Sequence, residues 1–278
     1  MDALYSQVFF PKTLGELFAS WNRFPNAVPF AGGTGIIYGQ EKRSLSLPSN
    51  IIALDRLDEL RHITRTERYL EIGAMVRLSD ILKLGKVLPQ ILREALSRTA
   101  NPQIRNIATI GGNICYSDWK LDAACALVAL DAQYELRTGA SSRWISATRF
   151  SASTEEKKLN RQELFTRLRI PLEHWDYTVY RKFNANQFGT AYTGATAFVA
   201  RIQKNILSEV RLVFSGETML RDKDSEAILT GKLLPLGKRE GKAFVELWEE
   251  YIAAAPVPNA VLKTWIINFI KSTVRNLA

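Results

Sequence analysis

Short apolar runs and helical periodicities alternate along the first part of the chain. Thr13 and Glu16, three residues apart, form the capping-box pattern of a helix start. Four apolar residues then recur at the spacing of one helix face: Leu14, Leu17, Phe18 and Trp21. Further apolar runs predict strands at residues 27–31, 51–54, 69–74 and 133–137, the first of them buried, and helices over residues 88–96 and 122–130.

The pattern changes near residue 170. A polar, charge-rich stretch covers residues 149–162, and the predicted strand that follows it ends at Pro171. Runs of strands followed by runs of helices are typical of an α+β domain. That order is found beyond Tyr177, where predicted strands at 195–202 and 210–215 precede predicted helices at 243–253 and 261–275. We therefore predict two domains, residues 1–174 and residues 175–278.

The composition is that of a globular protein. Of the 278 residues, 46% are hydrophobic and 23% are charged, which predicts one large core or two moderate ones. Residues 1–7 lack the basic and apolar regions of a secretory signal, and no segment approaches the roughly 18 apolar residues of a membrane span. We therefore expect a cytoplasmic protein without a membrane span.

The net charge of +9 has three interpretations. Nucleic-acid binding is not expected, because Lys and Arg are scattered and form no block on one face. A basic patch for cofactor phosphates or an acidic partner protein is the second interpretation, and a basic solvated surface is the third.

A metal site is not expected, because zinc and iron–sulfur sites need about four ligands. The chain has only two cysteines, Cys115 and Cys125, and two histidines.

Two glycine-rich segments are the candidates for ligand binding. Residues 32–35 read Gly-Gly-Thr-Gly after a short apolar run, and residues 109–113 read Thr-Ile-Gly-Gly-Asn. Glycines let backbone N–H groups converge on an anion such as a diphosphate, although a tight turn without a ligand is the alternative for each segment. The dinucleotide pattern G-x-G-x-x-G fails at Tyr38, and no P-loop pattern occurs, so a Rossmann fold and a P-loop fold are both disfavoured.

The same segments resemble one known family. Residues 31–34, Ala-Gly-Gly-Thr, resemble its A-G-G-T loop, and residues 103–114 read QIRNIATIGGNI, close to its signature Q-I-R-N-x-A-T-I-G-G-N-I. Asp122 stands nine residues after Asn113, and Asp131, in an Ala-Leu-Asp-Ala sequence, stands nine further on, as in the family. The chain therefore resembles the FAD-binding flavoprotein subunit of the molybdenum hydroxylases, the xanthine dehydrogenase and carbon monoxide dehydrogenase group.

This resemblance implies a fold and a function. The fold would be an α+β FAD-binding domain of the p-cresol methylhydroxylase and vanillyl-alcohol oxidase type, followed by a smaller α+β C-terminal flavoprotein domain. The function would be electron transfer through FAD, from the iron–sulfur clusters of a [2Fe-2S] subunit to NAD or another acceptor. A molybdopterin-binding subunit would be the second partner. No catalytic side chain is required, because the cofactor carries the redox chemistry.

The resemblance also implies which residues contact FAD. The diphosphate would lie between two groups of residues, the first being Phe30, Ala31, Gly32, Gly33, Thr34 and Gly35, and the second Thr109, Gly112, Asn113 and Tyr116. Asp122 would bind the ribityl–adenosine part, Phe165 would lie against the isoalloxazine ring, and Lys182 would lie near the pyrimidine edge. Each also has a structural interpretation: Phe30, Phe165 and Tyr116 as packing residues, Asp122 as a helix N-cap and Lys182 as a solvated strand residue.

Three departures from the family pattern leave alternatives open. Gly35 replaces a polar side chain, residues 115–121 replace an N-A-S-P-x-G run, and Asn184–Ala191 lacks an Arg-Arg…Asp stretch. One alternative is a free-standing FAD oxidoreductase of the same fold that oxidises its own small substrate. Another is a scaffold subunit that has lost FAD.

Overall fold

The computed structural model describes residues 7–38, 46–116, 122–152, 159–160, 162–187, 190–216, 218–255, 257 and 260–278. They form two compact units, and neither is continuous in sequence. Unit 1 comprises Met1–Leu88, Ala100–Ser117 and Asp131–Leu172, and unit 2 comprises Pro89–Thr99, Asp118–Leu130 and Glu173–Ala278. The linear division at residue 174 stays a prediction, and it differs from these units because two short segments before residue 131 belong to unit 2.

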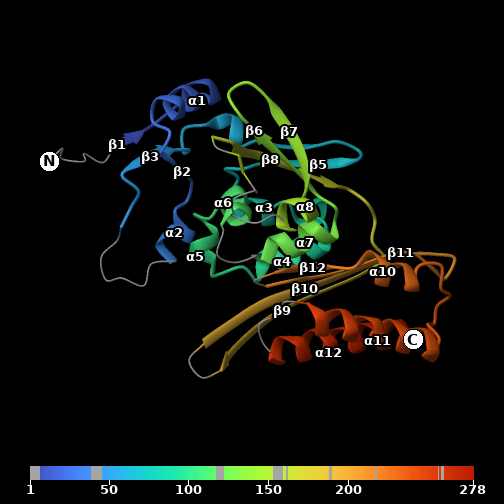
Figure 1. The fold of residues 1–278 in the computed structure, drawn as a ribbon. Helices are drawn as coiled ribbons and strands as arrows, with labels where there is room; N and C mark the ends of the chain where they lie inside the picture. The colour runs from blue at the N-terminus through green and yellow to red at the C-terminus, as the bar shows by residue number, and fades with distance from the viewer. Residues whose placement is uncertain are drawn as a thin grey trace. The chain divides into compact units, whose positions relative to one another are not determined.

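Unit 1 contains two sheets (Figure 1). The first is parallel, in the order β1-β3-β2, and the second is antiparallel, in the order β4-β5-β8-β6-β7. The strands are β1 Gln7–Phe9, β2 Val28–Phe30, β3 Asn50–Ala53, β4 Ile63–Arg65, β5 Tyr69–Gly73, β6 Gln133–Arg137, β7 Ser142–Ser146 and β8 Leu164–Pro171. The helices are α1 Leu14–Arg23, α2 Thr34–Tyr38, α3 Leu78–Leu82, α5 Pro102–Arg105, α6 Ile110–Cys115 and α8 Ala147–Ala152, with short 3-10 turns η1 Asp58–Leu60 and η2 Gly85–Val87.

Helix α1 forms where the sequence predicts it. The Thr13 hydroxyl accepts a hydrogen bond from the Glu16 amide at 3.1 Å, as an N-cap does. The Glu16 carboxylate accepts from the amide of Lys12 at 2.8 Å instead of that of Thr13, so the capping box closes one residue early. The four periodic residues of the helix are all buried and pack in a core cluster with Ile52 and Leu54 of the β3 region.

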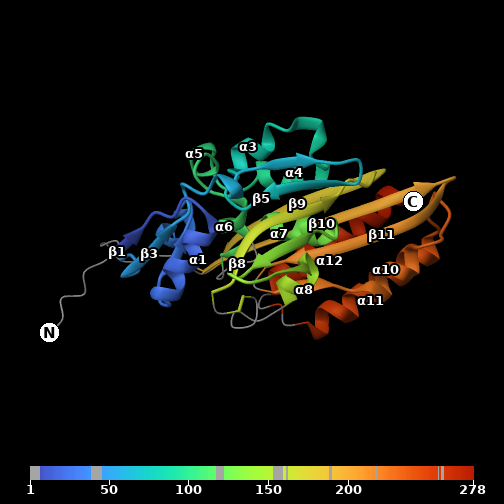
Figure 2. The same cartoon turned by 90° about the horizontal axis from the view of Figure 1, so that it is seen from above.

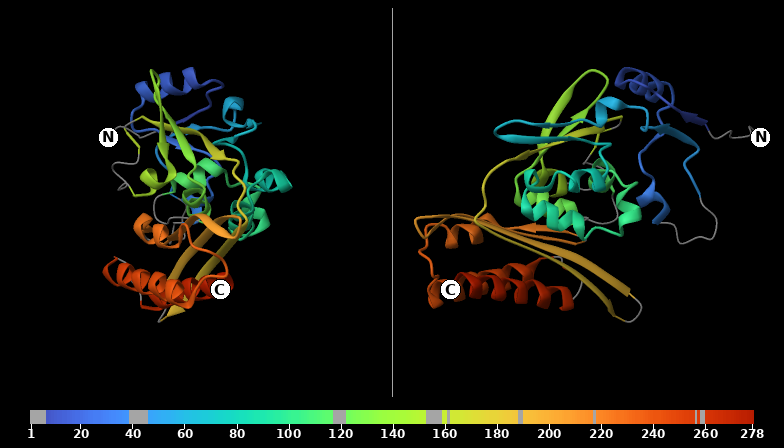
Figure 3. Two further views of the ribbon diagram at one scale, coloured as in Figure 1. Left: turned by 90° about the vertical axis from the view of Figure 1, so that its right-hand side faces the viewer. Right: turned by 180° about the vertical axis from the view of Figure 1, so that it is seen from behind.

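Unit 2 is one antiparallel sheet with helices on both faces (Figures 1 and 3). Its strand order is β12-β11-β10-β9, with β9 Tyr177–Gln187, β10 Thr190–Gln203, β11 Ile206–Ser215 and β12 Met219–Arg221. Strands β9, β10 and β11 lie side by side in Figure 2. The helices are α4 Gln90–Ser97, α7 Asp122–Ala129, α10 Lys223–Leu229, α11 Lys238–Ala254 and α12 Ala260–Leu277. Helices α4 and α7 pack on the face opposite to α11 and α12, whose Trp248 and Ile266 share a core cluster with Phe198 and Leu212 of the sheet.

Three expectations about local structure need correction. The strand near residue 28 exists as β2, but it is half exposed, because it is an edge strand that carries Pro29. The glycine-rich segment after Thr109 is the helix α6 and not a loop. Strands β4, β7 and β12 have no counterpart in the prediction, β9 was expected only as the strand of Lys182 without bounds, and β10 extends well beyond the predicted range of residues 195–202.

Candidate cofactor-binding site

The first glycine segment connects β2 to α2 in unit 1, and residues Ala31–Gly35 are called the glycine loop below. Gly33 has a φ of +68°, a conformation that favours glycine. A Cβ at Gly33 would lie 2.5 Å from Cζ of Phe30, so the Phe30 ring lies directly against this glycine. The Phe30 carbonyl accepts from the Leu54 amide and the Gly33 carbonyl from the Ile37 amide, both at 3.0 Å. These bonds tie the residue before the loop to Leu54 and connect the loop to the first turn of α2.

The amides of the glycine loop are available to a ligand. Within the part of the chain that the structure describes, the N–H groups of Gly32, Gly33, Thr34 and Gly35 donate no hydrogen bond to the protein. Backbone donors of this kind are nearly always satisfied in folded proteins, by water if not by protein. Successive unpaired N–H groups form the concave donor array that binds anions such as phosphates.

The second glycine segment is built differently. Thr109 is the N-cap of α6, and its hydroxyl accepts from the Gly112 amide at 3.1 Å. The Ile110 amide donates to the carbonyl of Val76 at 3.0 Å, and the Gly111 amide donates to the carbonyl of Ala74 at 2.9 Å. These amides are used within the protein, which corrects the expectation that both glycine segments offer free backbone donors.

Asn113 supplies the polar group of this segment that lacks a partner. Its side chain is 9% exposed, and its Oδ1 atom accepts no hydrogen bond from any described residue. An unpaired buried acceptor costs about 1–3 kcal/mol, so it marks a position where a ligand or water donates. A sugar or ribityl hydroxyl is such a donor.

The two glycine segments meet in unit 1. A Cβ at Gly32 would lie 2.2 Å from the carbonyl oxygen of Ile107, just before α6. A Cβ at Gly35 would lie 2.5 Å from Cδ2 of Tyr116, just after α6. The sequence analysis did not identify Ile107, which stands at the variable position of the signature, and no pattern in the sequence reveals its contact with Gly32.

Three further predicted site residues belong to elements other than the two glycine segments. Phe165 is 4% exposed in β8, and its ring packs against that of Tyr134 at 5.3 Å between centroids, which agrees with its interpretation as a core residue. Burial raises the pKa of the Tyr134 phenol, and the nearby Cys115 adds to the effect. Lys182 belongs to unit 2, where its Nζ lies 3.4 Å from the carbonyl oxygen of Arg98. Asp122 begins α7 in unit 2, and its side chain lies outside the described residues, as do residues 117–121.

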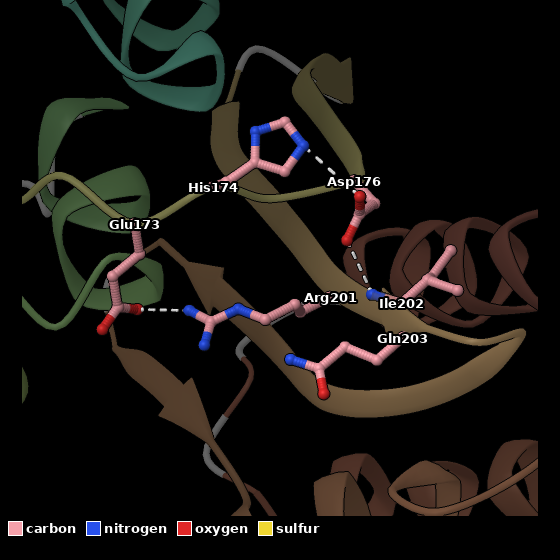
Figure 4. A pocket seen from close by; sticks show the side chains of 6 residues that line it. All are labelled: Glu173, His174, Asp176, Arg201, Ile202 and Gln203. Atoms are coloured by element: carbon pink, nitrogen blue, oxygen red, sulfur yellow. Dashed lines mark hydrogen bonds and ion pairs between the residues drawn. The ribbon is translucent and has the colours of Figure 1, made fainter.

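Unit 2 also has a pocket of about 410 Å³, formed by residues just before β9 and residues at the end of β10 (Figure 4). It is lined by Glu173, His174, Asp176, Arg201, Ile202 and Gln203, none of which the sequence analysis named. The Arg201 guanidinium pairs with Glu173 at 2.8 Å, and Asp176 accepts from the Ile202 amide at 2.7 Å (Figure 4). These charges satisfy one another within the unit, so the pocket offers no unpaired ion for a ligand.

Comparisons with known proteins identify the family. The family described as FAD binding domain in molybdopterin dehydrogenase matches residues 4–173. The chain belongs to this family. It is 29% identical over 213 residues to the glyceraldehyde dehydrogenase medium chain of Sulfolobus acidocaldarius, covering 75% of each chain. It is 27% identical over 230 residues to the xanthine dehydrogenase FAD-binding subunit of Escherichia coli O157:H7, covering 80% of this chain and 77% of that one.

Solved structures share the fold. A carbon monoxide dehydrogenase from Hydrogenophaga pseudoflava superposes with a TM-score of 0.80 at 24% identity, covering 97% of this chain and 94% of that one. Quinoline 2-oxidoreductase from Pseudomonas putida 86 gives a TM-score of 0.79 at 21% identity, covering 98% and 94%. The predicted α+β architecture, an FAD-binding domain followed by a C-terminal sheet domain, is confirmed. The chain is thus an FAD-binding subunit of the molybdopterin dehydrogenase family.

The residues of unit 1 fit this cofactor. The glycine loop offers unpaired amide donors for a diphosphate, and Asn113 offers an unpaired acceptor for a hydroxyl group.

The described residues include no group of three His, Cys, Asp or Glu side chains placed to hold a metal ion. Among the helices described, none is long and apolar enough to cross a membrane. The cytoplasmic location stays a prediction.

Proposed function

We propose that this chain is the electron-transfer subunit of a molybdenum hydroxylase complex of the xanthine dehydrogenase type. In that complex it would carry FAD between the iron–sulfur clusters of a [2Fe-2S] subunit and NAD or another acceptor. A molybdopterin-binding subunit would oxidise the substrate. Support comes from the family and from relatives that are named as medium chains or FAD subunits of dehydrogenases.

One observation carries the cofactor assignment to particular residues. The glycine loop presents four amides without a protein acceptor in the described structure, and the segment that contacts this loop carries the unpaired acceptor of Asn113. We assign the diphosphate of FAD to the amides of Gly32–Gly35 and a hydroxyl of FAD to Asn113. The α6 segment holds the loop in place, and the Thr109 hydroxyl still has its own proton to donate to an anion.

The remaining assignments rest on the resemblance alone. Asp122 is assigned to the ribityl–adenosine part, Phe165 to the isoalloxazine ring and Lys182 to its pyrimidine edge. FAD supplies the electron and hydride chemistry when it is bound, so these side chains are assigned to binding and orientation and not to proton transfer.

Purification of the tagged chain from its native cells tests the complex. Molybdenum, iron and flavin should copurify with it in fixed ratio, as measured by elemental analysis and by the flavin released on denaturation. The purified complex should then reduce NAD or an artificial acceptor when an N-heterocyclic substrate or an aldehyde is added. A flavin-containing chain that purifies without molybdenum and iron would support the free-standing oxidoreductase, and a colourless chain would support the scaffold.

A further inference from the structure

The ring of Tyr116 fills the space beside Gly35. A Cβ at Gly35 would lie 2.5 Å from Cδ2 and 2.8 Å from Cε2 of this ring. Side-chain carbon atoms do not approach one another this closely, because packed carbons sit about 3.5–4.0 Å apart. Gly35 does not have a positive φ, so close approach of the ring is the reason that glycine is required at this position.

The backbone on both sides of this contact is fixed. The Tyr116 amide donates to the Gly112 carbonyl at 3.1 Å and so closes the last turn of α6. At the other end of α6, the Ile107 carbonyl lies against Gly32. One continuous segment, residues 107–116, therefore touches the glycine loop at its first glycine and at its last.

Helix α2 buries no side chain fully. None of the described side chains of Thr34–Tyr38 is buried, and the side chain of Tyr38 is 70% exposed. Burial of an apolar face is what usually stabilises short helices, since nucleation of an isolated turn is unfavourable. The position of the loop amides therefore depends on contacts with the loop backbone, and the Tyr116 ring makes one of these contacts.

We infer that Tyr116 is a positioning residue for FAD binding. Its ring holds the backbone of Gly33–Gly35 so that the unpaired amides converge before the diphosphate arrives. Donors that are already ordered bind more tightly, because less conformational freedom is lost on binding. The inference rests on the proposed function in one respect, that the glycine loop binds FAD. The Tyr116 ring orders the loop amides, and its phenolic hydroxyl takes no part in this ordering.

The test uses three variants of the full chain and two readouts. Tyr116→Phe keeps the ring, Tyr116→Ala removes it, and Gly35→Ala introduces the methyl group that the ring excludes. The dissociation constant for FAD is measured by quenching of flavin fluorescence. Amide hydrogen exchange of the peptide that covers residues 31–38 is measured without FAD. Far-UV circular dichroism confirms that each variant is folded, and Tyr116→Leu replaces Tyr116→Ala if the latter does not fold.

The expected results separate the ring from the hydroxyl. Tyr116→Phe should bind FAD within about twofold of the wild type, whereas Tyr116→Ala should bind about tenfold more weakly, the usual order of coupling between contacting residues. Tyr116→Ala should also accelerate exchange of the loop amides. Gly35→Ala should weaken FAD binding in the wild-type background and have little further effect in the Tyr116→Ala background, where the methyl group has room.

Two results would overturn the inference. One is unchanged exchange and unchanged FAD affinity in Tyr116→Ala. The other is an equal loss of affinity in Tyr116→Phe and Tyr116→Ala, which would show that the hydroxyl contacts the cofactor directly. If the wild-type chain takes up no FAD, the proposed function fails instead. The exchange measurement then still decides whether the ring holds the loop.

Discussion

Replacement of Gly33 by alanine tests the structure of the glycine loop most sharply. Two costs are expected from the methyl group. The first is the left-handed backbone at φ +68°, which costs a non-glycine residue about 1–2 kcal/mol. The second is the Phe30 ring, whose Cζ and Cε1 atoms would lie 2.5 Å and 2.9 Å from the new Cβ. Overpacking of this kind costs about 1–3 kcal/mol, so Gly33→Ala should lower the free energy of unfolding by about 2–5 kcal/mol.

Gly85 provides a matched control in the same unit. It also has a positive φ, +58°, but no atom lies within 4 Å of the position that its Cβ would take. Gly85→Ala should therefore cost only the backbone strain of about 1–2 kcal/mol. Urea denaturation followed by circular dichroism measures both values, and the difference between them isolates the contact with Phe30.

A third variant, Phe30→Ala, separates the contact with the ring from the backbone strain at Gly33. In a Phe30→Ala background the ring is absent, so the effect of Gly33→Ala should fall to that of Gly85→Ala. Equal losses for Gly33→Ala and Gly85→Ala in the wild-type background would show that the ring does not lie against the loop. In FAD titrations, Gly33→Ala should also weaken binding, whereas Gly85→Ala should leave the affinity unchanged.

Three further predictions concern the surrounding structure. Gly111→Ala should lower the free energy of unfolding in urea by about 1–3 kcal/mol, because the new Cβ would lie 2.8 Å from the Cβ of Ala74. An unchanged free energy of unfolding would refute that packing. Glu226→Leu should cost about 3–5 kcal/mol, since it leaves Arg221 buried without its carboxylate, and Arg221→Met in addition should recover part of this loss. Burial raises the pKa of Glu163, but hydrogen bonds from Arg143 and Asn160 together with the Arg143 charge outweigh burial and lower the pKa overall. The stability lost in Glu163→Gln should therefore be largest near pH 7 and should vanish as the pH falls below 4.5 through the lowered pKa; a loss that persists in acid would contradict this account.

Elements with local causes could be predicted from the sequence. Helix α1 has its N-cap and its buried face within one short segment, so periodicity and capping were sufficient. Helix α6 was missed because two glycines lower helix propensity. Its first amides are satisfied by carbonyls of Ala74 and Val76, which are distant in sequence. The bounds of strand β9 could not be predicted, because the strand is largely polar and its conformation depends on pairing with β10.

The site shows the same division between local and distant causes. The sequence identified both glycine segments, because the A-G-G-T and T-I-G-G-N patterns are local. It did not reveal why each glycine is needed: Gly33 for its φ and the Phe30 ring, Gly32 for Ile107 and Gly35 for Tyr116. Those reasons depend on which chain segments face one another, and the sequence does not state that.

The central claim is that the chain binds FAD through the glycine loop. The most direct test is the visible absorption spectrum of the full chain after incubation with FAD and desalting, for the wild type and for Gly33→Ala. We predict that the wild type retains stoichiometric flavin with its two-band spectrum and that Gly33→Ala retains much less. A wild-type protein that stays colourless with excess FAD would contradict the claim, and equal retention by a folded Gly33→Ala would place the cofactor elsewhere.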